Sequence, residues 1–376
     1  MFASNKGINI RNSFFMNKFH PIFYSSNLLS SCAIYKTQFS KILDSAIVID
    51  SDEFKGKSYN SRQAFDAVSV TIIECGFYKC GKTNEVGGAL YINTDSKVDI
   101  SQSGFTQCFA KEAGTIYCKS SNLTMTYNCF DKSTSSSKYS ILQSIQTNQL
   151  TITQCFFTSC EGTESISINA KEVTITNSEF KSNNCHSSSL ITTSSTTVVL
   201  RDLLFENNSG NLMLDITLST NEFADSAIQV IKFNSNTAKS LIKASSDVQM
   251  FQVGVFSDSS ETIISSTSKV VTFRDSMFEF KFDYCESKLG ANGKAVEALN
   301  KFEQRAADMT AEVRPSQKCW ENVVTPAPET PGKKLSSTEI AVIVVVVILV
   351  AIVIIFLIRR CILSRKSGMM PLLYTV

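Results

Sequence analysis

Apolar positions recur along this chain in a fixed relation to a series of phenylalanines. Eleven segments follow one pattern: apolar, any, apolar, two residues, small, any, Phe, two residues, then Asn or Cys, as in LTITQCFFTSC and VTITNSEFKSN. The position five residues before the Phe is apolar in every segment. The gaps between these phenylalanines run from 22 to 28 residues, apart from one of 38. The eleven are Phe15, Phe39, Phe77, Phe105, Phe130, Phe157, Phe180, Phe205, Phe233, Phe256 and Phe278.

A second strand-like run follows most of these phenylalanines by eight to twelve residues, as in GGALYIN and SISINA. Short strands in units of about 25 residues, with Ser, Asn and Gly at the bends, are typical of a solenoid of strands. We therefore predict an all-β fold, a right-handed parallel β-helix of about eleven coils over residues 1–282, with residues 50–65 looping out of the long unit. A β-sandwich would not keep Phe in one register, and a leucine-rich horseshoe would need regularly spaced Leu.

Stacked coils place equivalent side chains above one another, so we expect a column of phenylalanine rings. Strand alternation directs Phe157 inward and its neighbour Phe156 outward. Asn three residues after Phe is expected to form a buried amide ladder, and Cys takes the same position in other units. The ladder positions are Asn183, Asn208, Asn236, Cys80, Cys108 and Cys160.

Residues 340–358 read IAVIVVVVILVAIVIIFLI, nineteen residues without a charged or polar side chain. At 1.5 Å per residue such a helix crosses a hydrocarbon layer of ~30 Å, whereas a buried core helix would show a polar face. Basic residues follow it without an acid, beginning with Arg359 and Arg360. The positive-inside rule then places the tail, 359–376, in the cytoplasm. We predict a single-pass type I protein of the plasma membrane with its N-terminal domain extracellular.

Two further regions lie between the repeats and this segment. Residues 283–324 are expected to form a membrane-proximal cap, with a short helix over 291–312, where Ala, Glu, Lys and Leu are frequent. Residues 325–339 hold three of the six prolines and suit an extended stalk. The first twenty residues lack the apolar core of a signal peptide, which favours a truncated N-terminus. The alternative is an N-terminal part that stays in the cytosol.

Charge and composition narrow the function classes. The formal net charge is +2 and 19% of residues are charged, which excludes a nucleic-acid partner recognised through bulk basicity. The only histidines are His20 and His186, too few for a histidine-rich metal centre, so we expect no metal and no cofactor. His186 is interpreted as a turn residue.

Twelve cysteines are present, of which Cys361 follows the apolar segment and is a candidate for palmitoylation. The other eleven are an odd number, so at least one lacks an intramolecular partner. The C-x4-C spacings fit buried thiols on the repeat better than a zinc site. A disulfide between Cys285 and Cys319 would close the cap.

The parallel β-helix is also the fold of polysaccharide-cleaving enzymes, so the sequence must be checked for the catalytic residues of such enzymes. Asn93-Thr94-Asp95 matches a short polygalacturonase-like triplet, yet no second pair of aspartates accompanies it. Glycoside cleavage uses two carboxylates ~5 to 9.5 Å apart. We interpret Asp95 as a turn residue and predict no catalytic residue.

Modification and sorting signals are short. Asn122 and Asn207 begin N-x-Ser/Thr sequons, which are glycosylation acceptors in the secretory route. In the tail, Leu372 and Leu373 form a dileucine-like element, and the apolar C-terminus at Val376 fits a PDZ-type groove of a cytoplasmic adaptor.

The repeat resembles that of the chlamydial polymorphic membrane proteins and of similar surface proteins of trichomonad parasites, whose units carry Phe-x-x-Asn and Gly-Gly-Ala-Ile. The counterparts are FKSN at Phe180, FENN at Phe205, FNSN at Phe233 and GGAL at Gly87, and the resemblance covers residues 8–281. The basic-flanked apolar segment favours the trichomonad-type group. The resemblance implies adhesion to host-cell, matrix or glycan ligands, or antigen display. The alternative is a membrane-tethered protein that binds or cleaves polysaccharide.

Overall fold

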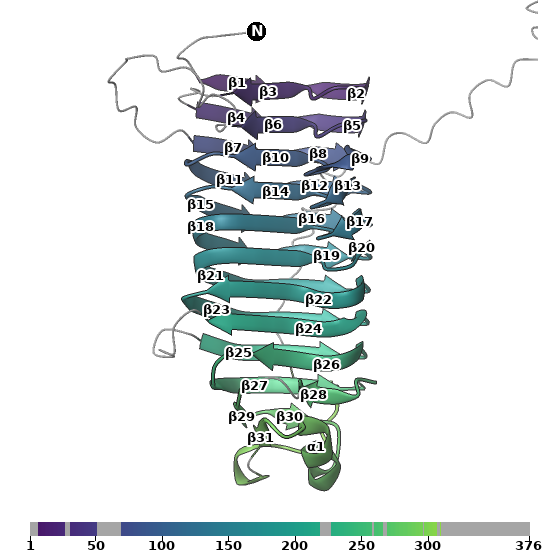
Figure 1. Ribbon diagram of the computed structural model, residues 1–376, viewed down its shortest axis with the longest axis vertical. Coiled ribbons are helices and arrows are strands. Elements are labelled where there is room, and N and C mark those ends of the chain that lie inside the picture. Colours follow the sequence, from purple (N-terminus) through teal and green to yellow (C-terminus); the bar gives the residue numbers. More distant parts are fainter. Residues whose placement is uncertain are drawn as a thin grey trace, which may run out of the picture. The chain divides into compact units, whose positions relative to one another are not determined.

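The computed structural model describes residues 7–26, 31–50, 69–218, 227–257, 259–265, 269–295, 297–306 and 309. In this part of the chain each strand pairs in parallel with its equivalent in the next repeat, which builds a β-solenoid of about ten coils (Figure 1). The predicted parallel solenoid is confirmed. By its internal contacts the chain divides into two units, Met1–Val324 and Thr325–Val376, and the solenoid belongs to the first.

Each coil contributes strands to three faces. The first face contains β1 (Ile8–Arg11), β4 (Ser31–Tyr35), β7 (Ser69–Ile73), β11 (Lys97–Ser101), β15 (Asn122–Thr126), β29 (Val271–Arg274) and β31 (Gly293–Ala295). The second, the phenylalanine face, contains β2 (Phe14–Lys18), β5 (Gln38–Ile42), β8 (Gly76–Tyr78), β12 (Gly104–Thr106), β16 (Cys129–Asp131), β19 (Phe156–Thr158) and β30 (Met277–Phe278). The third contains β3 (Phe23–Ser26), β6 (Ile47–Asp50), β10 (Leu90–Asn93), β14 (Ile116–Lys119) and β28 (Thr262–Ile264).

Other strands are short or run around the bends. Short strands lie between the second and third faces: β9 (Gly81–Val86), β13 (Phe109–Glu112), β17 (Thr134–Lys138) and β20 (Glu161–Gly162). Strands that continue around bends are β18 (Leu142–Thr153), β21 (Ile166–Lys181), β22 (Asn184–Ser195), β23 (Thr197–Glu206), β24 (Ser209–Leu218), β25 (Ala227–Asn234), β26 (Thr237–Ala244) and β27 (Val248–Phe256).

A column of stacked rings runs inside the phenylalanine face. Nine phenylalanines, from Phe15 to Phe233, stack in sequence with ring centroids 4.7 to 5.5 Å apart. Every ring from Phe39 onward is at most 1% exposed. The predicted aromatic column is therefore confirmed over these coils.

The column is interrupted at one coil, where the sequence-based register is wrong by one residue. Phe233 and Phe278 both pair with Val255, so Val255 points inward in place of Phe256. The apolar position five residues earlier is Met250, which is fully buried, whereas Phe251 is 37% exposed. In VQMFQVGVF both alternating sets of residues, those that would point inward and those that would point outward, contain apolar side chains. The sequence alone therefore does not show which set faces the core.

In the ten coils from that of Phe15 to that of Val255, two left-handed residues bend the chain, one on either side of the column. They lie three residues before and two residues after the column position, and their φ angles range from 46° to 56°. In the coil of Val255 they are Gln252 and Ser257, which supports the corrected register. Left-handed backbone is costly for residues with a Cβ, so the stacked neighbours must stabilise these bends.

Two buried ladders of polar side chains accompany the rings. The amide of Asn208 donates to the carbonyl of Phe180 at 2.8 Å and to Asn236 Oδ1 at 3.0 Å, and Asn183 repeats this arrangement one coil earlier. In the same position the Cys80 thiol donates to a Phe carbonyl. The predicted ladder is confirmed, and its amides satisfy backbone groups that the bends leave free.

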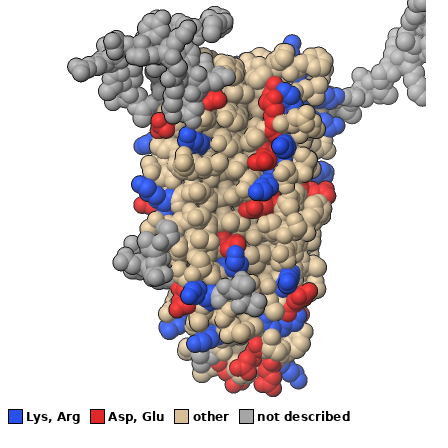
Figure 2. All heavy atoms as spheres, in the orientation of Figure 1, with Lys and Arg blue, Asp and Glu red and all other residues tan. Residues whose placement is uncertain are grey.

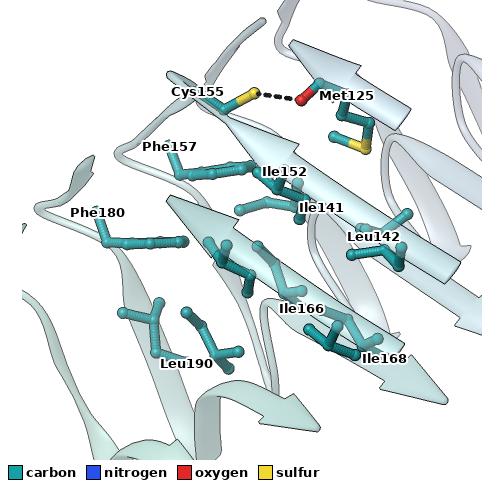
Figure 3. Close-up of a cluster of buried hydrophobic side chains, with 14 of the residues drawn as sticks. Met125, Ile141, Leu142, Ile152, Cys155, Phe157, Ile166, Ile168, Phe180 and Leu190 are labelled. Atoms are coloured by element: carbon teal, nitrogen blue, oxygen red, sulfur yellow. Dashed lines mark hydrogen bonds between the residues drawn. The ribbon is translucent and has the colours of Figure 1, made fainter. Parts of the chain in front are cut away.

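A second ladder, two residues before the column, was not predicted. The Cys155 thiol donates to the carbonyl of Met125 at 3.6 Å (Figure 3). Ser103 and Ser178 occupy the equivalent position, and their hydroxyls donate to a carbonyl two residues earlier. The two C-x4-C pairs, Cys75 with Cys80 and Cys155 with Cys160, thus consist of buried free thiols that lie on these two ladders.

The C-terminal end of the solenoid departs from the prediction. Where the structure describes residues 291–306, the helix expected over 291–312 is not formed: α1 spans Phe282–Leu289, a 3-10 helix (η2) spans Glu297–Leu299, and Gly293–Ala295 pairs with β29. Gly290, at φ 72°, ends α1. Pairing with the last open strand outweighs the helix propensity of the alanines that follow.

Several predictions fall on residues outside the described part: the loop at 51–65, the stalk, the apolar segment 340–358 and the tail. Within the described residues, no helix is long and apolar enough to cross a membrane.

Candidate binding surface

The outer side of the first face carries a regular array of threonine hydroxyls. In β15, β18 and β21 the sequences NLTMT, QLTIT and EVTIT direct their apolar residues inward and their threonines outward. The register aligns them in two columns of three, which we call the threonine face. The columns are Thr124, Thr151 and Thr174, and Thr126, Thr153 and Thr176.

The spacing of this array follows from strand geometry. Residues two apart in a strand lie ~6.7 Å apart, and neighbouring coils are ~4.8 Å apart. Thr153 and Thr176 share a hydrogen bond of 3.1 Å between their hydroxyl oxygens. A third column continues the polar pattern, since Asn122 donates to Gln149 Oε1 at 3.4 Å. The array thus offers hydroxyl and amide groups at a constant repeat.

The array has different neighbours at its two ends. Towards the N-terminus the equivalent positions are Asp99 and Ser101, and burial raises the pKa of the Asp99 carboxyl. Towards the C-terminus they are Val199 and Arg201. The six threonines therefore form a neutral patch between a carboxyl and a guanidinium group.

The other two faces differ in chemistry. On the third face, the rings of Tyr91 and Tyr117 stack with centroids 4.9 Å apart. On the phenylalanine face, Lys181 and Glu206 form an ion pair of 2.5 Å, which lowers the pKa of the Glu206 carboxyl. In the view of Figure 2, charges of both signs are scattered over a mostly neutral surface, so no single-sign patch dominates it.

The enzyme-like residues of the sequence are not brought into one site. Asp95 is exposed in the bend between β10 and β11, and Asn93 Nδ2 donates to Asp50 Oδ1 at 2.9 Å. His186 lies exposed near the start of β22, where its Nε2 is 3.0 Å from Glu161 Oε1. Within the described ranges, no group of three His, Cys, Asp or Glu side chains could hold a metal ion.

The two sequons have different surroundings. Asn207 is exposed at a left-handed bend (φ 54°) between β23 and β24. Asn122 is half-buried at the start of β15, next to the threonine face. Sequence reasoning found both asparagines but missed the threonines beside Asn122, although the alternating T-x-T pattern signals them.

The predicted disulfide between Cys285 and Cys319 needs correction. Cys285 is a buried free thiol, 0% exposed against the end of the solenoid, and burial raises its pKa to about 12. Cys319 and the proposed palmitoylation site Cys361 lie outside the described residues. Cys129, by contrast, is disulfide-bonded.

A hollow of about 550 Å³ lies beside the last coils, lined by Val230, Gln252, Asp275, Met277, Ala298, Leu299, Asn300, Lys301 and Met309. Its only ionisable side chains are one carboxyl and one amine, so it lacks the two carboxylates that glycoside cleavage uses.

Searches against protein-family models, curated proteins and solved structures found no match to this chain.

Proposed function

We propose that this protein is a single-pass surface protein that binds ligands through its solenoid, with the threonine face as the contact surface and glycans as the ligand class. The observation that carries the proposal is the in-register array of six outward threonines. A polymer of sugars presents hydroxyl groups at a regular repeat, and each contact with a threonine hydroxyl adds a modest amount to the affinity.

The proposal places this surface outside the cell. The apolar segment 340–358 anchors the chain, the basic residues after it hold the tail in the cytoplasm, and residues 325–339 act as a stalk. The coils are right-handed, as parallel crossover connections generally are. Adhesion or antigen display is the role that such an arrangement supports.

Binding is favoured over the alternative of polysaccharide cleavage. Among the described acids, Glu179 and Glu206 lie on neighbouring coils, but Glu206 is engaged by Lys181 and by Asn234 Nδ2. Cleavage needs one carboxyl free to protonate the leaving group and another facing the sugar. Two carboxyls flank the threonine face, Asp99 and Glu172, and they lie three coils, or ~14 Å, apart along the solenoid, which is farther than the ~5 to 9.5 Å that cleavage uses.

The test is binding of the full-length protein, in detergent micelles, to an array of glycans. Replacing Thr151 and Thr174 by Val keeps the side-chain shape but removes two central hydroxyls. We expect this double variant to bind its glycans at least tenfold more weakly while its thermal unfolding is unchanged. The matched control is Thr217→Val, an outward threonine of the third face, which should bind as the parent does.

Two results would overturn the proposal. Equal binding by the parent and the Thr151→Val/Thr174→Val variant would remove the threonine face from the contact. Depolymerisation of a polysaccharide by the purified protein, abolished by Asp95→Asn alone, would establish the enzyme instead.

A further inference from the structure

The outer side of the first face changes its chemistry at the C-terminal edge of the threonine face. Strand register continues the column of Thr126, Thr153 and Thr176 into the next four coils. Strand alternation directs the side chains of this continuation away from the core. Its members, which we call the arginine track, are Arg201, Gln229, Phe251 and Arg274.

The strands that carry the arginine track present cations and no acid on this side. On β23, β25, β27, β29 and β31 the outward residues of the first face include Arg201, Arg274 and Lys294, all exposed, and the others are uncharged. Two acids, Asp202 and Asp275, lie at the left-handed bend beside the track. Asp202 Oδ2 is 3.3 Å from Arg201 Nε, and among the described residues no other carboxylate pairs with these three cations.

Both arginines of the track are accessible to a ligand. The side chain of Arg201 is 56% exposed, and its ion pair with Asp202 occupies Nε but neither Nη atom. Ion pairs as exposed as this one contribute little to stability. Arg274 is exposed as well. A guanidinium group offers a planar fork of N–H donors that matches the two oxygens of a carboxylate or the oxygens of a sulfate.

An exposed aromatic ring lies between the two arginines. Phe251 is 37% exposed, because β27 directs Met250 into the core and Phe251 outward. One coil separates Phe251 from Arg274 and two coils separate it from Arg201, or ~4.8 and ~9.6 Å along the solenoid. The ring offers an apolar surface on which the C–H face of a sugar can pack. Aromatic residues and arginine are also the residue types that are enriched in binding surfaces.

We propose that the arginine track binds the carboxylate or sulfate groups of an acidic polysaccharide. This inference rests on the proposed function and names its ligand class, because Thr176 and Arg201 are neighbours in register and one extended polymer can contact both. Arg201 and Arg274 are three coils apart, or ~14 Å. The track is a single line of side chains, which fits a linear polymer better than the plane of an anionic lipid surface.

The first test compares three polymers on the full-length protein in detergent micelles. Heparin carries sulfates, polygalacturonate carries carboxylates, and dextran is neutral. We expect at least one acidic polymer to bind at least tenfold more tightly than dextran, and the preference to decrease as salt is raised, because salt screens exposed charges. The polymer that binds identifies the acidic group. Binding of dextran as tight as that of both acidic polymers would overturn the proposal.

The second test removes the two guanidinium groups. Arg201→Gln/Arg274→Gln should bind the acidic polymer at least tenfold more weakly, with the thermal unfolding of the parent. The matched control, Lys111→Gln/Lys239→Gln, removes the same charge from exposed positions on β13 and β26, outside the first face, and should bind as the parent does. Unchanged binding by the arginine variant, or equal weakening in both variants, would overturn the proposal.

The third test concerns the ring between the arginines. Phe251→Ala should bind the acidic polymer at least threefold more weakly, while the salt dependence of binding stays that of the parent, because the ring carries no charge. Binding equal to that of the parent would contradict a sugar packed between Arg201 and Arg274.

The outcomes separate this inference from the proposed function. If Thr151→Val/Thr174→Val weakens binding and the arginine variant does not, the threonine face binds glycan and the inference is wrong. If only the arginine variant weakens binding, the track binds the acidic polymer and the role proposed for the threonines is wrong. Binding to phosphatidylserine vesicles that the arginine variant loses, without binding to either acidic polymer, would assign the track to a lipid surface and overturn the proposal.

Discussion

The ring of Phe157 lies parallel to that of Phe180, with centroids 4.7 Å apart and an angle of 7° between the planes. The preceding residue, Phe156, pairs instead with Glu179 and lies outside the core. Two adjacent phenylalanines thus occupy opposite sides of one strand, and their contributions to stability can be compared directly.

We predict that Phe157→Ala lowers the free energy of unfolding by ~3–5 kcal/mol, because it leaves a cavity between two stacked rings. Phe156→Ala should cost less, ~1.5–3 kcal/mol, since it loses burial without opening the column. Urea unfolding of both variants measures the difference. Equal losses would contradict the assigned register.

The repeat pattern predicted most of the interior, and the reasons are visible in particular residues. Phe180 and Asn183 each fill a position that recurs in every coil, so one repeat supports the next. At Val255 and Phe256 both possible registers place an apolar residue in the column, so the repeat pattern does not distinguish them. In the structure Val255 points inward, and Phe256 is buried beneath Lys232 on the other side of the strand.

The candidate binding surface was harder to predict from the sequence than the interior. Thr151 and Thr153 are ordinary strand residues, and only the register shows that they align with four others. The disulfide bond of Cys129 was not predicted from the sequence. The cap helix was misplaced because strand pairing at Gly293–Ala295 depends on the open end of the solenoid.

The asparagine ladder leads to a second prediction. Asn208→Ala removes the side-chain partners of the buried Phe180 carbonyl and Asn183 N–H, whereas Asn236 Oδ1 still accepts from the backbone N–H of residue 208. Leaving a buried polar group unpaired costs ~1–3 kcal/mol, so we expect these two groups to lower the free energy of unfolding in urea by roughly 2–5 kcal/mol.

The matched control for the ladder is Asn207→Gly at the adjacent exposed bend. Glycine adopts the left-handed conformation of this bend readily, so stability should change by less than ~1 kcal/mol. A comparable loss in both variants would mean that the ladder does not stabilise the coil.

Glycosylation should distinguish the two sequons. Asn207 is exposed, whereas the Nδ2 of Asn122, the atom that would carry the sugar, donates to Gln149. We predict that protein from a secretory host carries a glycan at Asn207 and much less at Asn122, as measured by peptide mapping. Fuller occupancy at Asn122 than at Asn207 would contradict this, and a glycan there should also weaken binding at the threonine face.

The proposed orientation in the membrane can be tested with two tags. An epitope inserted near Ala327 should be stained on intact cells, and one appended after Val376 only after permeabilisation. Staining of the C-terminal tag on intact cells would reverse the orientation.

The buried thiols predict how stability depends on pH. Burial raises the pKa of Cys155 from 9.0 to about 12, and similarly that of Cys32 and Cys118. In the unfolded chain these thiols ionise near pH 9, while the folded state keeps their protons. Their contribution is therefore complete below pH 9 and is lost as the pH rises towards 12.

As the pH rises from 8 to 10, each such thiol should lower the free energy of unfolding by about 1.4 kcal/mol. Urea transitions at constant ionic strength measure this change. Cys155→Ser is the matched variant, because serine already fills this ladder position at Ser103 and Ser178 and donates to a carbonyl there. Since serine does not ionise in this range, the variant should lose about 1.4 kcal/mol less than the parent over the same interval. An identical pH dependence in the two proteins would show that the Cys155 thiol is not held protonated in the core.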